Sequence, residues 1–93
     1  MEPNSDVRPR TAVVIPCYRV KDKVLGVIEA MGPEVDSIIC VDDACPENSG
    51  DFIRERTRDP RMVVLKHEKN QGVGGATLTG YAHALSHHMD IVV

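Results

Sequence analysis

Several features that would point to particular classes of protein are missing from the sequence. No apolar run approaches the ~20 residues of a membrane-spanning helix, and the polar start MEPNSDVRPR is not a signal peptide. The net charge is −3, whereas a nucleic-acid-binding domain normally has a basic surface. Internal repeats are absent as well, so one compact unit is expected.

Cysteines and aromatic residues are few. Cys17, Cys40 and Cys45 form neither a zinc-binding pattern nor a CxxC pair, and their odd number favours reduced thiols and a cytoplasmic location. The chain has two tyrosines, one phenylalanine and no tryptophan, so an aromatic side chain in a loop stands out. Hydrophobic residues make up 42% and charged residues 27%, which is the composition of an ordinary globular domain.

The two ends of the chain differ in character. Residues 1–10 are predicted to form a flexible N-terminal segment, and residues 11–93 one domain. The chain ends in the apolar run MDIVV, with no turn signal and no polar tail. We therefore expect the sequence to be a fragment of a longer protein.

Apolar, β-branched runs alternate with amphipathic segments along the domain, which predicts four buried strands and three helices. The predicted strands are TAVVIP (11–16), DSIICVDD (36–43), RMVVLKH (61–67) and DIVV (90–93). The predicted helices are KDKVLGVIEAM (21–31), ENSGDFIRERTRD (47–59) and a third that packs through Leu78, Tyr81, Ala82 and Leu85. This order, β-α-β-α-β-α-β, predicts an α/β fold: a doubly wound, mainly parallel sheet with helices on both faces.

The first two helices have recognisable ends. The first is expected to place Val24, Leu25, Ile28 and Met31 on one apolar face and to stop at Gly32 and Pro33. The second is expected to take Asn48 or Ser49 as its N-terminal cap.

Ligands of such sheets bind at the carboxyl ends of the strands, so residues 16–19, 42–45 and 67–75 are the segments of interest. Asp42 and Asp43 end the second predicted strand without an adjacent lysine or arginine. One interpretation is a turn in which an aspartate caps the next helix. The other is a carboxylate that accepts a hydrogen bond from the N–H of a nucleobase.

Tyr18 follows the first predicted strand and so falls on the same edge. Its ring could stack on a planar base, an interaction worth roughly 1–3 kcal/mol in nucleic-acid complexes. Alternatively, the ring covers the rim of the sheet.

The segment KHEKNQGVGGATLTGYAHAL (66–85) places glycines at the start of a helix, although each interior glycine costs up to ~1 kcal/mol relative to alanine. Gly72, Gly74 and Gly75 could let backbone N–H groups approach an anion at the helix N-terminus, or could form a flexible connection. Gly80 is expected to allow close packing of the helix on the sheet. The segment is not a P-loop, because no Gly-Lys-Ser/Thr follows. Nor is it the dinucleotide fingerprint, which follows the first strand of its unit.

His83 and His87 have the i, i+4 spacing of a possible metal pair, but no third ligand is evident. We interpret them, with His88, as an exposed helix face and predict no metal site.

Taken together, VVIPCY, IICVDDACPENS, VVLKHEKNQGVGGATLTGYAHAL and DIVV resemble the amino-terminal half of the inverting family-two glycosyltransferases with the GT-A fold. Among these enzymes they look most like bacterial polysaccharide and polyprenol-phosphate sugar transferases. The resemblance runs from about Thr11 to Val93 and implies a partial nucleotide-sugar-binding domain. It implies transfer of a sugar from a nucleotide-diphosphate sugar, with a UDP-sugar favoured over GDP, in polysaccharide or glycolipid synthesis.

The resemblance also implies a set of donor-binding residues. Pro16 and Tyr18 would lie beside the nucleobase, Asp43 would accept a hydrogen bond from a base N–H, and Asp42 would shape the same turn. The loop beside the diphosphate would contain Asn70, Gly72, Gly74 and Gly75.

Some positions depart from the family pattern. Arg19 and Val20 stand where many relatives have Asn-Glu, and Cys45 stands where serine is frequent. Val73 stands where many relatives have a lysine or arginine, which leaves Lys69 or Arg19 as the candidate cation for the diphosphate.

The family's divalent cation, Mg or Mn, is bound by an acidic DxD-type motif after the fourth strand, and the catalytic base comes later still. Both would lie beyond residue 93, so we expect no catalytic residue here and an inactive fragment. The acceptor could be a polyprenol phosphate or a growing glycan. Such relatives often have carboxyl-terminal hydrophobic segments, so the parent protein could act at the cytoplasmic face of the membrane. Self-association through an unpaired fourth strand, residues 90–93, is a further expectation.

Two alternatives remain open. IICVDD also resembles the opening strand of a phosphoacceptor receiver domain, a signalling module. That interpretation needs an aspartate at the end of a later strand, whereas Asp90 precedes its strand. The other alternative is an α/β nucleotide-binding domain without transfer activity.

Overall fold

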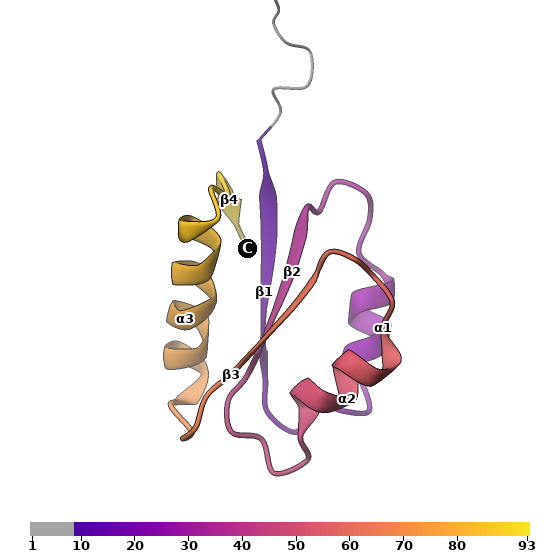
Figure 1. Cartoon of the computed structure of the whole chain (residues 1–93), viewed down its shortest axis with the longest axis vertical. Coiled ribbons are helices and arrows are strands. Elements are labelled where there is room, and N and C mark those ends of the chain that lie inside the picture. The colour runs from indigo at the N-terminus through magenta and orange to yellow at the C-terminus, as the bar shows by residue number, and fades with distance from the viewer. Residues whose placement is uncertain (1–8) are drawn as a thin grey trace, which may run out of the picture.

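The computed structural model describes residues 9–93, in which strands and helices alternate from β1 to β4 (Figure 1). The flexible segment predicted over residues 1–10 lies, apart from Pro9 and Arg10, outside the described residues. The elements are β1 (Thr11–Cys17), α1 (Val24–Glu29), β2 (Ser37–Asp42), α2 (Ser49–Arg56), β3 (Met62–Lys66), α3 (Gly72–Ser86) and β4 (Ile91–Val92).

The four strands form one sheet in the order β3-β2-β1-β4, and every neighbouring pair is parallel. The predicted doubly wound parallel sheet is therefore confirmed, with β4 beside β1. β2 is buried at all six of its positions, because it lies inside the sheet and has helices over both faces. Pro16 lies within β1, opposite Val41 of β2.

Two hydrophobic clusters cover the two faces, and the strands divide their side chains between them. On one face, Cys17, Ile38 and Cys40 pack with Val24 and Ile28 of α1 and with Ile53 of α2. On the other face, Ala12, Ile39 and Val41 pack with Ala76 and Ala84 of α3. Figure 1 shows the same division, with α3 on one side of β1 and the other two helices on the opposite side. Successive strand residues point to opposite faces, which explains the alternation.

The packing face predicted for α3 is wrong. Its buried residues are Ala76, Gly80 and Ala84, whereas Leu78 and Leu85 are each 68% exposed. Tyr81 and Ala82 are also exposed. The reason is the close approach of helix and sheet at Gly80, where a Cβ atom would collide with the Val14 side chain. The prediction that Gly80 permits this approach is confirmed.

The first two helices differ from expectation at their ends. Of the face predicted for α1, Val24 and Ile28 are buried and Leu25 is partly buried. Met31 is outside the helix, because α1 ends at Glu29 with Ala30 as its C-cap, before Gly32. α2 begins after Asn48, but neither Asn48 nor Ser49 caps it through its side chain. The backbone N–H of Gly50 instead donates to Asp42 at the end of β2. No helix within residues 9–93 is long and apolar enough to cross a membrane.

Candidate nucleotide-binding edge

Hydrogen bonds join the loops that follow the first two strands at the carboxyl edge of the sheet. The backbone N–H of Asp43 donates to the Cys17 carbonyl at 3.1 Å. The N–H of Arg19 donates to the Cys45 sulfur, also at 3.1 Å. Arg19 and Ala44 have positive φ values of 58° and 56°, which residues other than glycine rarely adopt. These strained positions lie in the two loops that hold Tyr18 and the aspartate pair.

Asp42 connects β2 to α2. Its Oδ1 accepts from the N–H of Cys45 and its Oδ2 from the N–H of Gly50, both at 2.8 Å. The residue is 2% exposed. Asp42 thus shapes the turn after β2 and caps α2. This is the first of the two interpretations given for the aspartate pair, in which an aspartate caps the next helix.

Asp43 connects β2 to α3 and gathers three donors on its carboxylate. Oδ1 accepts from the N–H of Gln71 and from Nδ1 of His67, and Oδ2 accepts from the N–H of Gly72, each at 2.8 Å. The Asn70 side-chain amide donates to the Asp43 carbonyl at 3.2 Å. Asp43 therefore holds the start of the glycine segment against the end of β2.

These donors stabilise the ionised carboxylate and lower the pKa of Asp43 below its ordinary value. The hydrogen bond from His67 is the largest cause, and the backbone N–H groups of Gln71 and Gly72 add to it, outweighing the opposite effect of burial. The N-terminus of α3 favours negative charge in the same direction. At neutral pH, Asp43 is a buried anion with matched donors.

His67 was not identified as a site residue from the sequence, although it lies in the segment after the third strand. Its N–H donates to the Asp42 carbonyl at 2.8 Å, which fixes its backbone beside the aspartate pair. Its ring lies between Asp43 and Thr79, whose Oγ1 is 2.8 Å from Nε2. The His67 side chain is 7% exposed. The available signal was position alone, since a histidine directly after a strand lies on the ligand edge.

The residues predicted to lie beside the nucleobase, Pro16 and Tyr18, belong to β1 and the loop that follows it. Tyr18 follows the last residue of β1 and is 42% exposed, with the Arg19 guanidinium 5.5 Å from its ring centroid. Tyr18 is thus adjacent in the chain to Cys17, which bonds to Asp43, and to Arg19, which bonds to Cys45. Pro16 lies two residues before Tyr18, inside β1. The structure therefore brings Tyr18, Asp43 and the start of α3 to one edge.

The three glycines at the start of α3 differ in what a side chain would meet. Gly72 has φ of +82°, so any other residue there is strained. At Gly75 a Cβ atom would lie 2.6 Å from the Gln71 Cβ. At Gly74 a Cβ atom would meet nothing within 4 Å. Nothing in the described chain therefore requires a glycine at 74, and the space over it is open.

Cys45 contacts the loop that holds Tyr18, through the hydrogen bond from the N–H of Arg19 to its sulfur. Burial alone would raise the pKa of its thiol, but hydrogen bonds from the Ser49 hydroxyl and from the backbone of Arg19, Glu47 and Ser49 lower that pKa below its ordinary value. Cys45 is 5% exposed. Its sulfur serves as an acceptor that holds two loops together.

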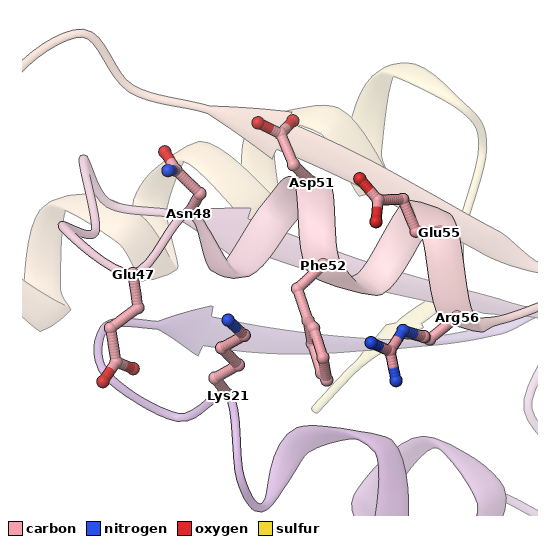
Figure 2. Close-up of a pocket in the computed structure, with 7 residues that line it drawn as sticks. All are labelled: Lys21, Glu47, Asn48, Asp51, Phe52, Glu55 and Arg56. Carbon is pink, nitrogen blue, oxygen red and sulfur yellow. The ribbon is translucent and has the colours of Figure 1, made fainter.

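Two shallow hollows lie next to this edge, between the loop after β1 and α2. The first has a volume of about 300 Å³, and Figure 2 shows the Phe52 ring pointing into it between Lys21 and Arg56. Both cations stack on that ring, at 5.1 and 4.9 Å from its centroid. The second, of about 520 Å³, shares this ring and adds Arg19. Of the residues considered for donor binding, only Arg19, a candidate cation for the diphosphate, lines either hollow.

Within residues 9–93, no three His, Cys, Asp or Glu side chains are grouped as a metal ion would require. The oxygens of Asp42 and Asp43 accept from backbone N–H groups. His83 and His87 stack on each other, with ring centroids 4.0 Å apart. The described residues thus do not fit the divalent cation implied by the resemblance.

The fold and this edge define a class: a Rossmann-like α/β domain with an open parallel sheet, whose first two loops and third helix meet at the carboxyl ends of the strands. The sequence profile described as "Glycosyl transferase family 2" matches residues 12–91. The chain belongs to this family of glycosyltransferases.

Two characterised relatives are similar over most of the chain. One is the UDP-N-acetylglucosamine–dolichyl-phosphate N-acetylglucosaminyltransferase of Methanococcus voltae, 30% identical in an alignment 95 positions long, gaps included, that covers 87% of this chain and 38% of the relative. The other is the undecaprenyl-phosphate mannosyltransferase of Micrococcus luteus, 33% identical in an alignment 88 positions long that covers 90% of this chain and 36% of the relative. The chain thus spans somewhat more than a third of the length of these relatives.

Proposed function

We propose that residues 11–93 bind the nucleoside diphosphate of a sugar donor, with a UDP-sugar favoured, for a glycosyltransferase whose remaining parts lie outside this chain. The observation that supports this proposal is the meeting of three segments at Asp43, where the carboxylate holds the start of α3 beside the turn that bears Tyr18. One relative is named for a UDP-sugar.

In the proposed complex, the Tyr18 ring stacks on the base, beside Pro16. Asp43 accepts a hydrogen bond from a base N–H, and Asp42 supports the turn from below through Cys45 and Gly50. The diphosphate lies over the open backbone at Gly74, near Asn70, Gly72 and Gly75. Asp43 already accepts from the N–H of Gly72. The remaining N–H groups of the first turn of α3, and the dipole of the helix, are what we propose this anion meets.

For the whole enzyme we propose inverting displacement. An oxygen of the acceptor forms a bond to C1 of the sugar while the bond from C1 to the diphosphate oxygen breaks, and the nucleoside diphosphate leaves. A carboxylate base takes the acceptor proton. A divalent cation, Mg or Mn, if bound by residues outside this chain, would supply positive charge for the leaving diphosphate. We place the base and the metal ligands outside these residues, so the chain alone is expected to be inactive.

Both relatives are named for polyprenyl phosphates, dolichyl and undecaprenyl. We propose the same kind of acceptor here, in glycolipid or polysaccharide synthesis at the cytoplasmic face of a membrane. A growing glycan is the other acceptor to test. Self-association of this chain through β4 is a separate proposal, taken up in the Discussion.

The direct test is titration of ¹⁵N-labelled protein with UDP, GDP and acetyl phosphate, followed by backbone amide shifts. We expect UDP to shift the signals of Tyr18, Asp43 and Gly72–Gly75. Acetyl phosphate is the probe for the receiver alternative, which predicts phosphorylation of an aspartate. Phosphorylation without nucleotide binding would overturn the proposal.

Gly74→Ala separates binding from folding. The new methyl group meets no protein atom, and alanine improves the helix by up to ~1 kcal/mol, so the variant should be at least as stable as the parent chain. If the diphosphate lies over Gly74, UDP should bind several-fold more weakly to this more stable protein. Tyr18→Ala, at an exposed ring, is the matched test of base stacking. Unchanged UDP affinity in both variants would contradict the proposed site.

A further inference from the structure

The Asp43 carboxylate has a limited number of acceptor sites. An ionised carboxylate accepts about four hydrogen bonds, two at each oxygen. Two donors, His67 Nδ1–H and Gln71 N–H, fill Oδ1. One donor, Gly72 N–H, occupies Oδ2. Among residues 9–93 no other donor bonds to this carboxylate, so a single acceptor site remains, on Oδ2.

The donor role of His67 follows from its partners. The ionised Asp43 can only accept, so Nδ1 must carry the proton shared between them at 2.8 Å. On the other side of the ring, Thr79 Oγ1 is 2.8 Å from Nε2 and 3.0 Å from the Gly75 carbonyl. The single hydroxyl proton of Thr79 goes to Gly75 when the ring is charged, and to Nε2 when it is neutral. In both arrangements Nδ1–H donates to Asp43.

We infer that His67 is a positioning residue that leaves Asp43 one acceptor site and thereby selects a uracil over a guanine nucleotide. Uracil presents one N–H, at N3, between two carbonyl groups. Guanine presents two adjacent donors, N1–H and the N2 amino group, which suit a carboxylate with both oxygens free. Here one guanine donor would lose its partner on binding. The inference rests on the proposed function, in which Asp43 faces the base.

The expected discrimination can be given as a ratio of dissociation constants. A buried donor left without a partner typically weakens binding by about tenfold or more. UDP should therefore bind to the chain at least about tenfold more tightly than GDP. His67→Ala removes the donor together with the ring that covers this side of Oδ1. The open Oδ1 site should let GDP gain affinity, so that the ratio falls toward one.

Two variants serve as controls. His67→Asn retains an amide N–H at about the place of Nδ1, so it should retain most of the preference for UDP. Thr79→Val removes the partner of Nε2 and leaves the bond from Nδ1 to Asp43, so its preference should equal that of the parent chain. A merely structural role for His67 predicts instead that both nucleotides weaken together in the Asn and Ala variants, with the ratio unchanged.

The outcomes are separable. If neither UDP nor GDP binds to the parent chain, the proposed function fails and this inference fails with it. If both bind equally well, or if folded His67→Ala keeps its preference, the inference alone is overturned. Should His67→Ala not fold, long-range ¹H–¹⁵N spectra of the parent chain decide. A protonated Nδ1 whose signal shifts on UDP binding, together with retained selectivity in His67→Asn, supports the inference, whereas an unprotonated Nδ1 overturns it.

Discussion

At the scale of single residues, Asp42 and Asp43 show how adjacent identical side chains acquire different tasks. Successive side chains of an extended strand point to opposite faces. Asp42 therefore reaches the N-terminus of α2 on one face, and Asp43 reaches the N-terminus of α3 on the other. Both carboxylates serve as helix caps, but only Asp43 also holds a histidine.

The Asp43 cap makes stability depend on pH in a defined direction. Its pKa in the folded chain lies below the ordinary 3.8, so its contribution to stability is complete above 3.8 and is lost as the pH falls through the folded pKa. We expect the difference in unfolding free energy between the parent chain and Asp43→Asn to be constant above about pH 5 and to shrink under acid. Denaturant unfolding at a series of pH values measures it. Asp59, whose pKa Arg61 lowers to about 2, affects both proteins equally and cancels. A difference that grows under acid would contradict the prediction.

The three thiols should differ in reactivity. Cys17 and Cys40 are fully buried, and Cys17 together with burial raises the pKa of Cys40. Cys45 is slightly exposed and its pKa is lowered by hydrogen bonds. Iodoacetamide should therefore modify Cys45 first, which mass spectrometry of digested protein can follow over time. Cys45→Ser is the control and should lack the first modification. Earlier labelling of Cys17 or Cys40 would show that the order is wrong.

At the scale of elements, the glycines of α3 combine an observed packing requirement with the ligand contact that we propose. Gly80 contacts Val14 in the middle of β1, while Gly74 faces open space. The same residue type thus packs a helix against a strand at position 80 and, six residues earlier, leaves room for the proposed ligand. A substitution at each position separates them.

Gly80→Ala should destabilise the fold. The added methyl group collides with Val14, and overpacking of this kind typically costs about 1–3 kcal/mol, more than the gain of up to ~1 kcal/mol in helix propensity. Gly74→Ala is the matched control on the same helix and should raise the unfolding free energy slightly. Urea denaturation of both variants measures the contrast. Equal stabilities would mean that α3 can move away from β1 without cost.

At the scale of the whole molecule, two surfaces are unusual for a small domain. β4 pairs with β1 on one side and forms an edge of the sheet, with Ile91 43% exposed. The outer side of α3 exposes Val73, Leu78 and Leu85. Open strand edges and apolar patches both favour contact with another chain.

We expect the chain to self-associate through the edge of β4. Two copies can extend the sheet by pairing these edges, because their backbone groups face outward. Sedimentation equilibrium should show an apparent mass that rises with protein concentration. Ile91→Lys should make this rise smaller. Leu85→Lys distinguishes the helix surface from the strand edge, since only strand pairing predicts that it has little effect. A monomer at all concentrations would contradict the expectation.

Local chemistry in the sequence was enough to predict the strands, the order of elements and the edge on which Tyr18, Asp43 and the glycines lie. β-branched runs, glycines and prolines act over a few residues, and parallel strands with crossover helices leave few possible arrangements. Only the tertiary structure decided that α3 packs through Ala76, Gly80 and Ala84, because that choice depends on Val14, far away in the chain. It also placed His67 against Asp43, 24 residues earlier, because a hydrogen bond between segments exists only once the sheet has brought their ends together.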